Sequence, residues 1–312
     1  MILRIYIVYL ISFNFPTIYC ESLLNSLPEN ETQALSLADK VMTYKTIGNI
    51  SLKLYIFTPK NLTKVEKRPA ILFIHGGAWA AGSPAVHAFE SLYFSKRGFV
   101  TATISYRLLK KGARTPLDCF DDAKSAIQYL RKYANQLNID TNRIICSGSS
   151  AGGHLAASLA NVHYITTANE PNSISYRPNA LILLYPAFDL INGWMGGRKK
   201  CEKAGIDVPS FSPAQLVNSE TPPTVILSGA EDPISTTHSN NAFIQLMKKH
   251  HNSALFIEFE GRGHKLFERN KNDPHFRSVI YHIETFLKQQ NYINEILSQP
   301  ISLKINSYSS RQ

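Results

Sequence analysis

Short apolar runs alternate with longer amphipathic segments over most of the chain. The runs predict buried strands at Ala70–His75, Phe99–Ser105, Arg143–Ser147, Ala180–Tyr185, Thr224–Ser228 and Leu255–Glu260. The segments between and after them predict helices at Pro84–Lys96, Asp118–Leu137, Ala151–Asn161, Thr236–His251 and Pro274–Gln290. This alternation is typical of a mostly parallel sheet with helices on both faces. The sequence therefore predicts a single α/β domain over residues 21–298.

Three regions depart from this alternation. Val41–Gly48 and Ile50–Phe57 read as two strands meeting at Gly48-Asn49, which predicts an antiparallel hairpin at one edge of the sheet. Ala187–Pro223 fits no regular element, and a long irregular insertion in a compact domain is often functional. We expect it to form a lid or a pocket wall. Residues 299–312 are polar and are expected to form a C-terminal tail.

The first twenty residues resemble a secretory signal peptide. Arg4 precedes the short apolar stretch Ile5–Ile11, and polar residues follow Cys20. The stretch is shorter than the roughly 20 residues that a membrane span needs. We expect residues 1–20 to be removed, which predicts a secreted or periplasmic protein with no stable membrane span. A lipoprotein anchored at Cys20 is the alternative.

Composition narrows the classes of partner. The formal net charge is +10, but the basic residues are scattered in short pairs, which argues against a nucleic-acid surface. The three cysteines after residue 20, at positions 119, 146 and 201, show no CxxC spacing. We therefore expect no metal site and buried free thiols, although whether the three cysteines pair stays open. We also expect no cofactor. Oligomeric state is not indicated.

Gly148-Ser149-Ser150-Ala151-Gly152 matches the pattern G-x-S-x-G, with Ser150 at its centre. Glycines two residues to either side permit the sharp strand-to-helix turn that lifts a serine hydroxyl clear of a sheet. Ser147 and Ser149 lack glycines at these offsets. Because a strand is predicted before the motif and a helix after it, Ser150 is the candidate nucleophile.

A serine hydroxyl needs a base to take its proton. The topology places an acid after a later strand and a histidine after the next. Asp232 follows the strand at Thr224–Ser228, and His264 follows the strand at Leu255–Glu260. We predict that Asp232 orients His264 and that His264 deprotonates Ser150. Glu231 is the alternative acid.

Two other histidines lie near predicted strand ends. His154 lies one helical turn beyond Ser150, so we expect it to be structural. His75 begins His75-Gly76-Gly77-Ala78-Trp79, directly after a strand. Backbone N–H groups exposed by two glycines suit an oxyanion hole, so we expect His75 to buttress that loop. The predicted oxyanion donors are the backbone N–H groups of Gly76, Gly77, Ala78 and Ala151.

These stretches together resemble the α/β-hydrolase superfamily. The likeness is carried by "HGGAWAAGSP", "SYRL", "SGSSAGGHLAASLA", "TPPTVILSGAEDPIS" and "EGRGHKLF". It is greatest to secreted acetyl-esterase and lipase-like enzymes, near the hormone-sensitive-lipase group and bacterial acetyl-xylan or feruloyl esterases. The resemblance implies an α/β-hydrolase fold and a Ser150, Asp232, His264 triad. HGGAW in place of HGGG, and Lys265 after the histidine, depart from the commoner pattern.

The resemblance implies a serine esterase that acts on short-chain esters, such as acetyl esters, of small molecules or carbohydrates. Trp79, Ser149 and Trp194 are the candidate pocket residues. HGGAW also resembles the HGGxW of kynurenine formamidases, so arylformamide hydrolysis is an alternative. A non-catalytic binding module on the same fold is a second alternative.

Overall fold

The computed structural model describes residues 22–60, 66–162, 174–268, 270–295 and 305–309. The predicted signal peptide, residues 1–20, lies outside this part of the chain. The strands are β1 Lys40–Ile47, β2 Ile50–Phe57, β3 Arg68–Ile74, β4 Val100–Ile104, β5 Ile139–Ser149, β6 Ala180–Leu184, β7 Thr224–Gly229, β8 Ala254–Phe259 and β9 Ile305–Ser309. The α-helices are α2 Glu31–Ser36, α3 Ala88–Lys96, α4 Pro116–Lys132, α5 Ala134–Leu137, α6 Ala151–Asn161, α7 Met195–Lys203, α8 Thr237–Lys249 and α9 Pro274–Gln289.

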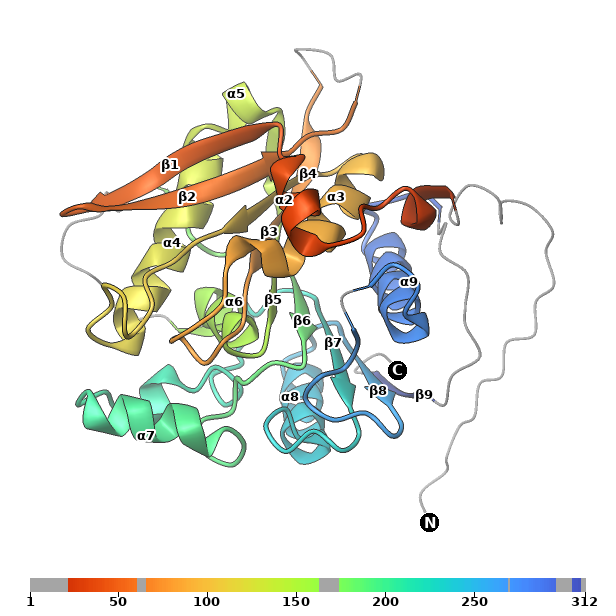
Figure 1. The fold of residues 1–312 in the computed structure, drawn as a ribbon. Coiled ribbons are helices and arrows are strands. Elements are labelled where there is room, and N and C mark those ends of the chain that lie inside the picture. The colour runs from red at the N-terminus through yellow and green to blue at the C-terminus, as the bar shows by residue number, and fades with distance from the viewer. Residues whose placement is uncertain (1–21, 61–65, 163–173, 269, 296–304, 310–312) are drawn as a thin grey trace.

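The strands form one sheet with the order β1-β2-β4-β3-β5-β6-β7-β8-β9. Neighbouring strands from β4 to β8 run parallel, whereas β1, β2 and β9 pair antiparallel with their neighbours. Figure 1 shows the hairpin β1–β2 at the upper left, beside the helix-covered sheet. The predicted mostly parallel sheet with helices on both faces, and its N-terminal antiparallel hairpin, are confirmed.

The sheet buries a separate apolar cluster on each face. Side chains alternate along the strands, so Leu72 packs on one face of β3 and Phe73 on the other. The first face is covered by α4, α6 and α8, and the second by α2, α3 and α9. Because both faces are covered, the inner parallel strands read as the continuous apolar runs seen in the sequence.

Two segments differ from the sequence-based expectation. The predicted polar tail contains β9, whose residues Ile305–Ser309 pair with β8 at the sheet edge. Tyr308 explains this difference, since its ring stacks on Phe256 at 5.3 Å and its hydroxyl lies 3.3 Å from Glu258. The insertion predicted to be irregular contains α7 and a short 3-10 helix at Pro209–Phe211.

Candidate active site

Ser150 lies at the turn between β5 and α6. Its backbone has φ 53° and ψ −121°, a strained conformation for a residue with a side chain. The flanking glycines are required by close approach: a Cβ on Gly152 would lie 2.0 Å from the carbonyl oxygen of Ile74. The strand, the sharp turn and the helix predicted around Ser150 are thus all present.

Ser150, His264 and Asp232 form one hydrogen-bonded chain. The Oγ of Ser150 lies 2.7 Å from Nε2 of His264. Nδ1 of His264 lies 3.0 and 2.9 Å from the two carboxylate oxygens of Asp232. Because a carboxylate only accepts hydrogen bonds, Nδ1 carries the proton, which leaves Nε2 to accept the Ser150 hydroxyl proton.

The loop after β7 holds the Asp232 carboxylate in place. Its Oδ1 accepts the backbone N–H groups of Ile234 at 2.8 Å and Ser235 at 2.9 Å. The side chain of Asp232 is completely buried, whereas Glu231 is exposed and its backbone N–H donates to the carbonyl oxygen of Arg262. The geometry therefore selects Asp232 over Glu231 as the partner of His264.

His154 is structural in position. It is buried in α6, and its Nε2 donates to the carbonyl oxygen of Phe211 at 2.9 Å. Burial lowers the pKa of His154 to about 3, so its ring is neutral at ordinary pH. The hydroxyl of Ser150 is instead contacted by His264.

The loop after β3 presents backbone N–H groups beside Ser150. Gly77 has φ 109°, and a Cβ there would lie 2.2 Å from the carbonyl oxygen of Ala81, so only glycine fits. Among the described residues, no backbone hydrogen bond uses the N–H of Gly77 or Ala78. Ala151, as the first residue of α6, has no acceptor within its helix. These N–H groups suit a developing oxyanion.

The side chains of His75 and Tyr106 contact the start of this loop. His75 is buried, its Nδ1 lies 2.7 Å from the carbonyl oxygen of Gly76, and its ring stacks on Tyr106 at 4.3 Å. The Tyr106 hydroxyl donates to the carbonyl oxygen of His75 at 2.9 Å. The backbone N–H of Leu109 donates to the carbonyl oxygen of Trp79 at 2.8 Å. His75 thus buttresses the loop, as the sequence predicted.

A pocket of about 490 Å³ opens above Ser150. Of the residues predicted for the site, it is lined by Ser150, His264, Gly76, Gly77, Ala78, Ser149 and Trp194. Its other lining residues were not predicted from the sequence; they are Gly82, Val86, Tyr185, Ile234 and Lys265. Their positions in the sequence offer a signal for three of them, since Lys265 follows His264, Tyr185 directly follows β6, and Ile234 lies two residues after Asp232.

The prediction of Trp79 as a pocket residue is wrong. Trp79 is fully buried and does not line the pocket. Positive φ angles at Ala78 and Trp79 turn the ring inward, where it packs 4.4 Å from the ring of Trp194 and 4.9 Å from that of His154. Trp194 does line the pocket, so the insertion supplies part of the wall as expected, with Trp79 behind it.

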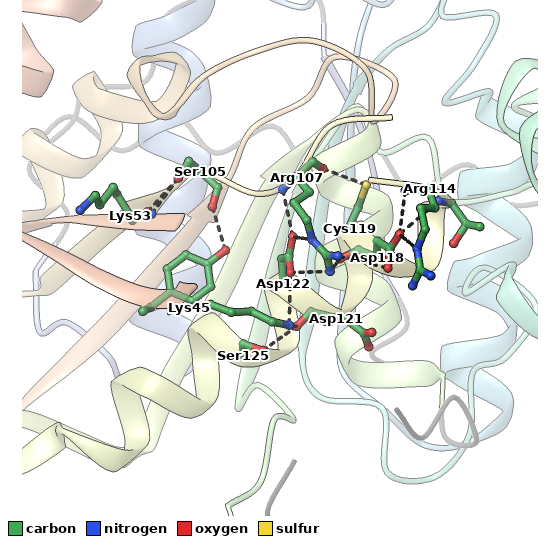
Figure 2. Close-up of polar contacts among 12 residues, drawn as sticks. Lys45, Lys53, Ser105, Arg107, Arg114, Asp118, Cys119, Asp121, Asp122 and Ser125 are labelled. Atoms are coloured by element: carbon green, nitrogen blue, oxygen red, sulfur yellow. Dashed lines mark hydrogen bonds and ion pairs between the residues drawn. The ribbon is translucent and has the colours of Figure 1, made fainter. Parts of the chain in front are cut away.

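The segment that supports the oxyanion loop is itself anchored by a buried ion network, which Figure 2 shows. Arg107 follows Tyr106, and its Nε and Nη2 donate to the two carboxylate oxygens of Asp122 at 2.8 and 2.9 Å. Asp118 and Lys45 extend the network at 3.3 and 3.2 Å. The side chain of Asp122 is completely buried. This bidentate pair joins the segment after β4 to α4 and so holds the two in a fixed relative position.

Replacing Asp122 with alanine is expected to lower the free energy of unfolding by about 3–5 kcal/mol, because it leaves the buried Arg107 guanidinium without its bidentate partner. Urea denaturation followed by circular dichroism measures this change. The exposed pair Arg198–Glu202 provides the control, since Glu202→Ala breaks a contact of 2.8 Å at the surface and should change stability by less than about 1 kcal/mol. Equal effects of the two substitutions would contradict the assigned role.

The cysteines of the described part of the chain are buried. Cys119, Cys146 and Cys201 are free thiols, and burial raises the pKa of Cys146 and Cys201 to about 12. Within the described ranges, no three His, Cys, Asp or Glu side chains gather as a metal ion would require. No helix in the part of the chain that the structure covers is long and apolar enough to cross a membrane.

The sequence of this chain is similar to a known protein family and to several curated esterases. A family model described as BD-FAE matches residues 54–247. A probable isoprenylcysteine alpha-carbonyl methylesterase of Arabidopsis thaliana is 25% identical over 68% of this chain and 48% of its own length. Esterase LipC of Mycobacterium tuberculosis is 27% identical over 63% of this chain and 52% of its own. The chain thus spans about half the length of these curated relatives.

One solved structure is matched over nearly its whole length. It is a thermophilic esterase of Thermogutta terrifontis with propionate bound, and it is 32% identical with a TM-score of 0.77. The match covers 83% of this chain and 97% of that one. The same esterase has been solved with butyrate bound and phosphorylated by paraoxon.

Proposed function

Because the chain belongs to the BD-FAE family of α/β-hydrolases, we propose that it is a serine carboxylesterase whose nucleophile is Ser150. One observation carries this proposal: the Ser150 hydroxyl is hydrogen-bonded to His264, which is hydrogen-bonded to the buried Asp232, beside a loop that presents backbone N–H donors. Nucleophile, base, orienting acid and oxyanion donors are the complete set that acyl transfer requires.

The reaction proceeds in two halves. His264 Nε2 takes the Ser150 proton as Oγ attacks the ester carbonyl, and the N–H groups of Gly77, Ala78 and Ala151 stabilise the oxyanion. The C–O bond to the alcohol then breaks, and His264 gives its proton to the leaving alkoxide. Water next attacks the acyl-Ser150 ester with His264 again as base, releasing the carboxylic acid and restoring the serine.

We propose short acyl groups as the preferred substrates. The pocket is modest in volume, and Val86, Trp194 and Ile234 give it apolar walls. The Thermogutta esterase, whose fold matches this chain, was solved with propionate and with butyrate. A short acyl chain buries its methylene groups against such walls, whereas a long chain must leave part of its length in water. Small-molecule and carbohydrate alcohols are both candidates for the other half of the ester.

A series of p-nitrophenyl esters tests this preference. We expect kcat/KM to be highest for acetyl to butyryl esters and to fall by at least about tenfold for a decanoyl ester, because the longer chain exceeds the pocket. Release of p-nitrophenol is measured at one ionic strength for all substrates. A rise in kcat/KM up to the decanoyl ester would contradict the proposed acyl preference without touching the role of Ser150.

The arylformamidase alternative is tested in the same assay. The chain carries HGGAW at the oxyanion loop, but its tryptophan is buried behind the pocket and does not line it. We therefore propose that esters are the better substrates. A kcat/KM for an N-formyl arylamine above that for every ester would reverse this order. Complete absence of turnover and of labelling by paraoxon would support the non-catalytic alternative.

A further inference from the structure

A second polar chain lies next to the nucleophile. The Oγ of Ser149 lies 3.1 Å from Nε2 of His87, and Nδ1 of His87 lies 3.2 Å from Oε1 of Glu90. His87 and Glu90 are 0% exposed and Ser149 is 1% exposed. His87 and Glu90 come from the segment that leads into α3 and from α3 itself, on the face of the sheet opposite α6. The proposed reaction uses none of the three.

Burying the hydrogen-bonded residues Ser149, His87 and Glu90 destabilises the folded state. Glu90 Oε2 has no hydrogen-bond partner among the described residues, and its side chain is fully enclosed. A buried carboxylate oxygen without a partner destabilises the folded state, and apolar residues of similar volume are often neutral or stabilising in such places. Folding stability therefore does not account for this pair beneath the pocket.

Ser149 contacts both the oxyanion loop and the turn at Ser150, whose spacing must stay fixed for the reaction. A Cβ on Gly76 would lie 2.9 Å from the carbonyl oxygen of Ser149, 3.1 Å from Cβ of Ser150 and 3.4 Å from Oγ of Ser149. The oxyanion loop therefore rests directly on the Ser149–Ser150 backbone. Val86, which precedes His87, lines the same pocket as Ser149. Ser149 thus joins the turn at Ser150, the oxyanion loop and the pocket wall.

We propose that Glu90, His87 and Ser149 form a positioning relay that holds the Ser150 turn and the oxyanion loop at a fixed spacing during acyl transfer. The Nδ1–H of His87 donates to Glu90, which fixes the ring so that Nε2 meets the Ser149 hydroxyl. Ser149 in turn fixes the surface on which Gly76 rests. The relay acts on the proposed esterase reaction and rests on that function.

The test removes the polar partners together. In His87→Leu/Glu90→Leu, both are replaced by apolar side chains, so no buried charge is left alone. We expect kcat on p-nitrophenyl acetate to fall by about tenfold to a hundredfold, as small misplacements of reacting groups do. KM should stay within about twofold, and the urea midpoint should not fall. Ser149→Ala should lower kcat in the same range, and adding it to the double variant should change kcat by less than about twofold.

Tyr93→Phe on the same helix is the matched control. The Tyr93 hydroxyl is buried and donates to Glu284 at 2.8 Å, on the side of α3 that meets α9. This variant should lose stability and keep the wild-type kcat. An unchanged kcat in Ser149→Ala, or effects of Ser149→Ala and the double variant that multiply in the triple variant, would overturn the relay. Absence of ester turnover in the wild type would instead overturn the proposed function on which the relay rests.

Discussion

Replacing Ser150 with alanine is expected to reduce ester turnover by on the order of 10⁴-fold or more, because the acyl-enzyme route disappears with the hydroxyl. The structure predicts little effect on folding. Alanine removes one atom that contacts His264 at 2.7 Å, and the pocket-lining position leaves no buried cavity. Release of p-nitrophenol from the acetyl ester measures the rate, and circular dichroism reports the fold.

Ser36→Ala on α2 is the control, since Ser36 is exposed and does not line the pocket. It should match the wild type within about twofold. Paraoxon supplies a second readout, because an organophosphate reacts much faster with an activated serine than with an ordinary serine hydroxyl. Peptide mass analysis should find one phosphorylated serine, Ser150, and none in Ser150→Ala. Wild-type turnover in Ser150→Ala would place the nucleophile elsewhere.

Hydrophobic pattern predicts the central strands well because burial on both faces leaves little room for polar residues. β6 begins at the predicted Ala180, and α6 spans Ala151–Asn161 as expected. The pattern does not predict elements that depend on a few tertiary contacts instead of an apolar face. In α7, the sequence MGGRKKCEK has only a short buried face, formed by Gly197 and Cys201. Gly197 packs against the ring of Trp194, and Cys201 is buried in the core. β9 likewise depends on ring stacking of Tyr308 on β8.

In the site, too, the sequence predicts residues in local motifs but not contacts between residues that lie far apart in the chain. Glycine spacing singles out Ser150, and strand ends single out Asp232 and His264, because parallel strands bring their carboxyl ends to one edge. The direction of a loop side chain is not encoded locally, so the sequence does not reveal that Trp79 turns away from the pocket. His87 lies 62 residues from Ser149 in sequence, so no local motif connects them.

Asp232→Asn is expected to reduce kcat by about 10³- to 10⁴-fold, because it moves the ring proton of His264 from Nδ1 to Nε2. Oδ1 of Asp232 accepts two backbone N–H groups, from Ile234 and Ser235. In the variant, the amide oxygen must keep that position, so the NH₂ group takes the place of Oδ2, 2.9 Å from His264 Nδ1. The amide oxygen still lies 3.0 Å from Nδ1, but the NH₂ group is at least as near and can only donate. Its hydrogen bond to Nδ1 favours the tautomer with the ring proton on Nε2, in which His264 cannot take the Ser150 proton.

Glu231→Gln is the matched control for Asp232→Asn, as both exchange a carboxylate for an amide in adjacent residues. Glu231 is exposed and Asp232 is buried against His264, so Glu231→Gln should leave kcat within about twofold of the wild type. Both variants should stay folded, since the new amide oxygen in Asp232→Asn keeps the two backbone hydrogen bonds that the carboxylate accepts. A larger loss of kcat in Glu231→Gln would assign the orienting acid to Glu231 and contradict the geometry, because the two carboxylates cannot both reach Nδ1 of His264.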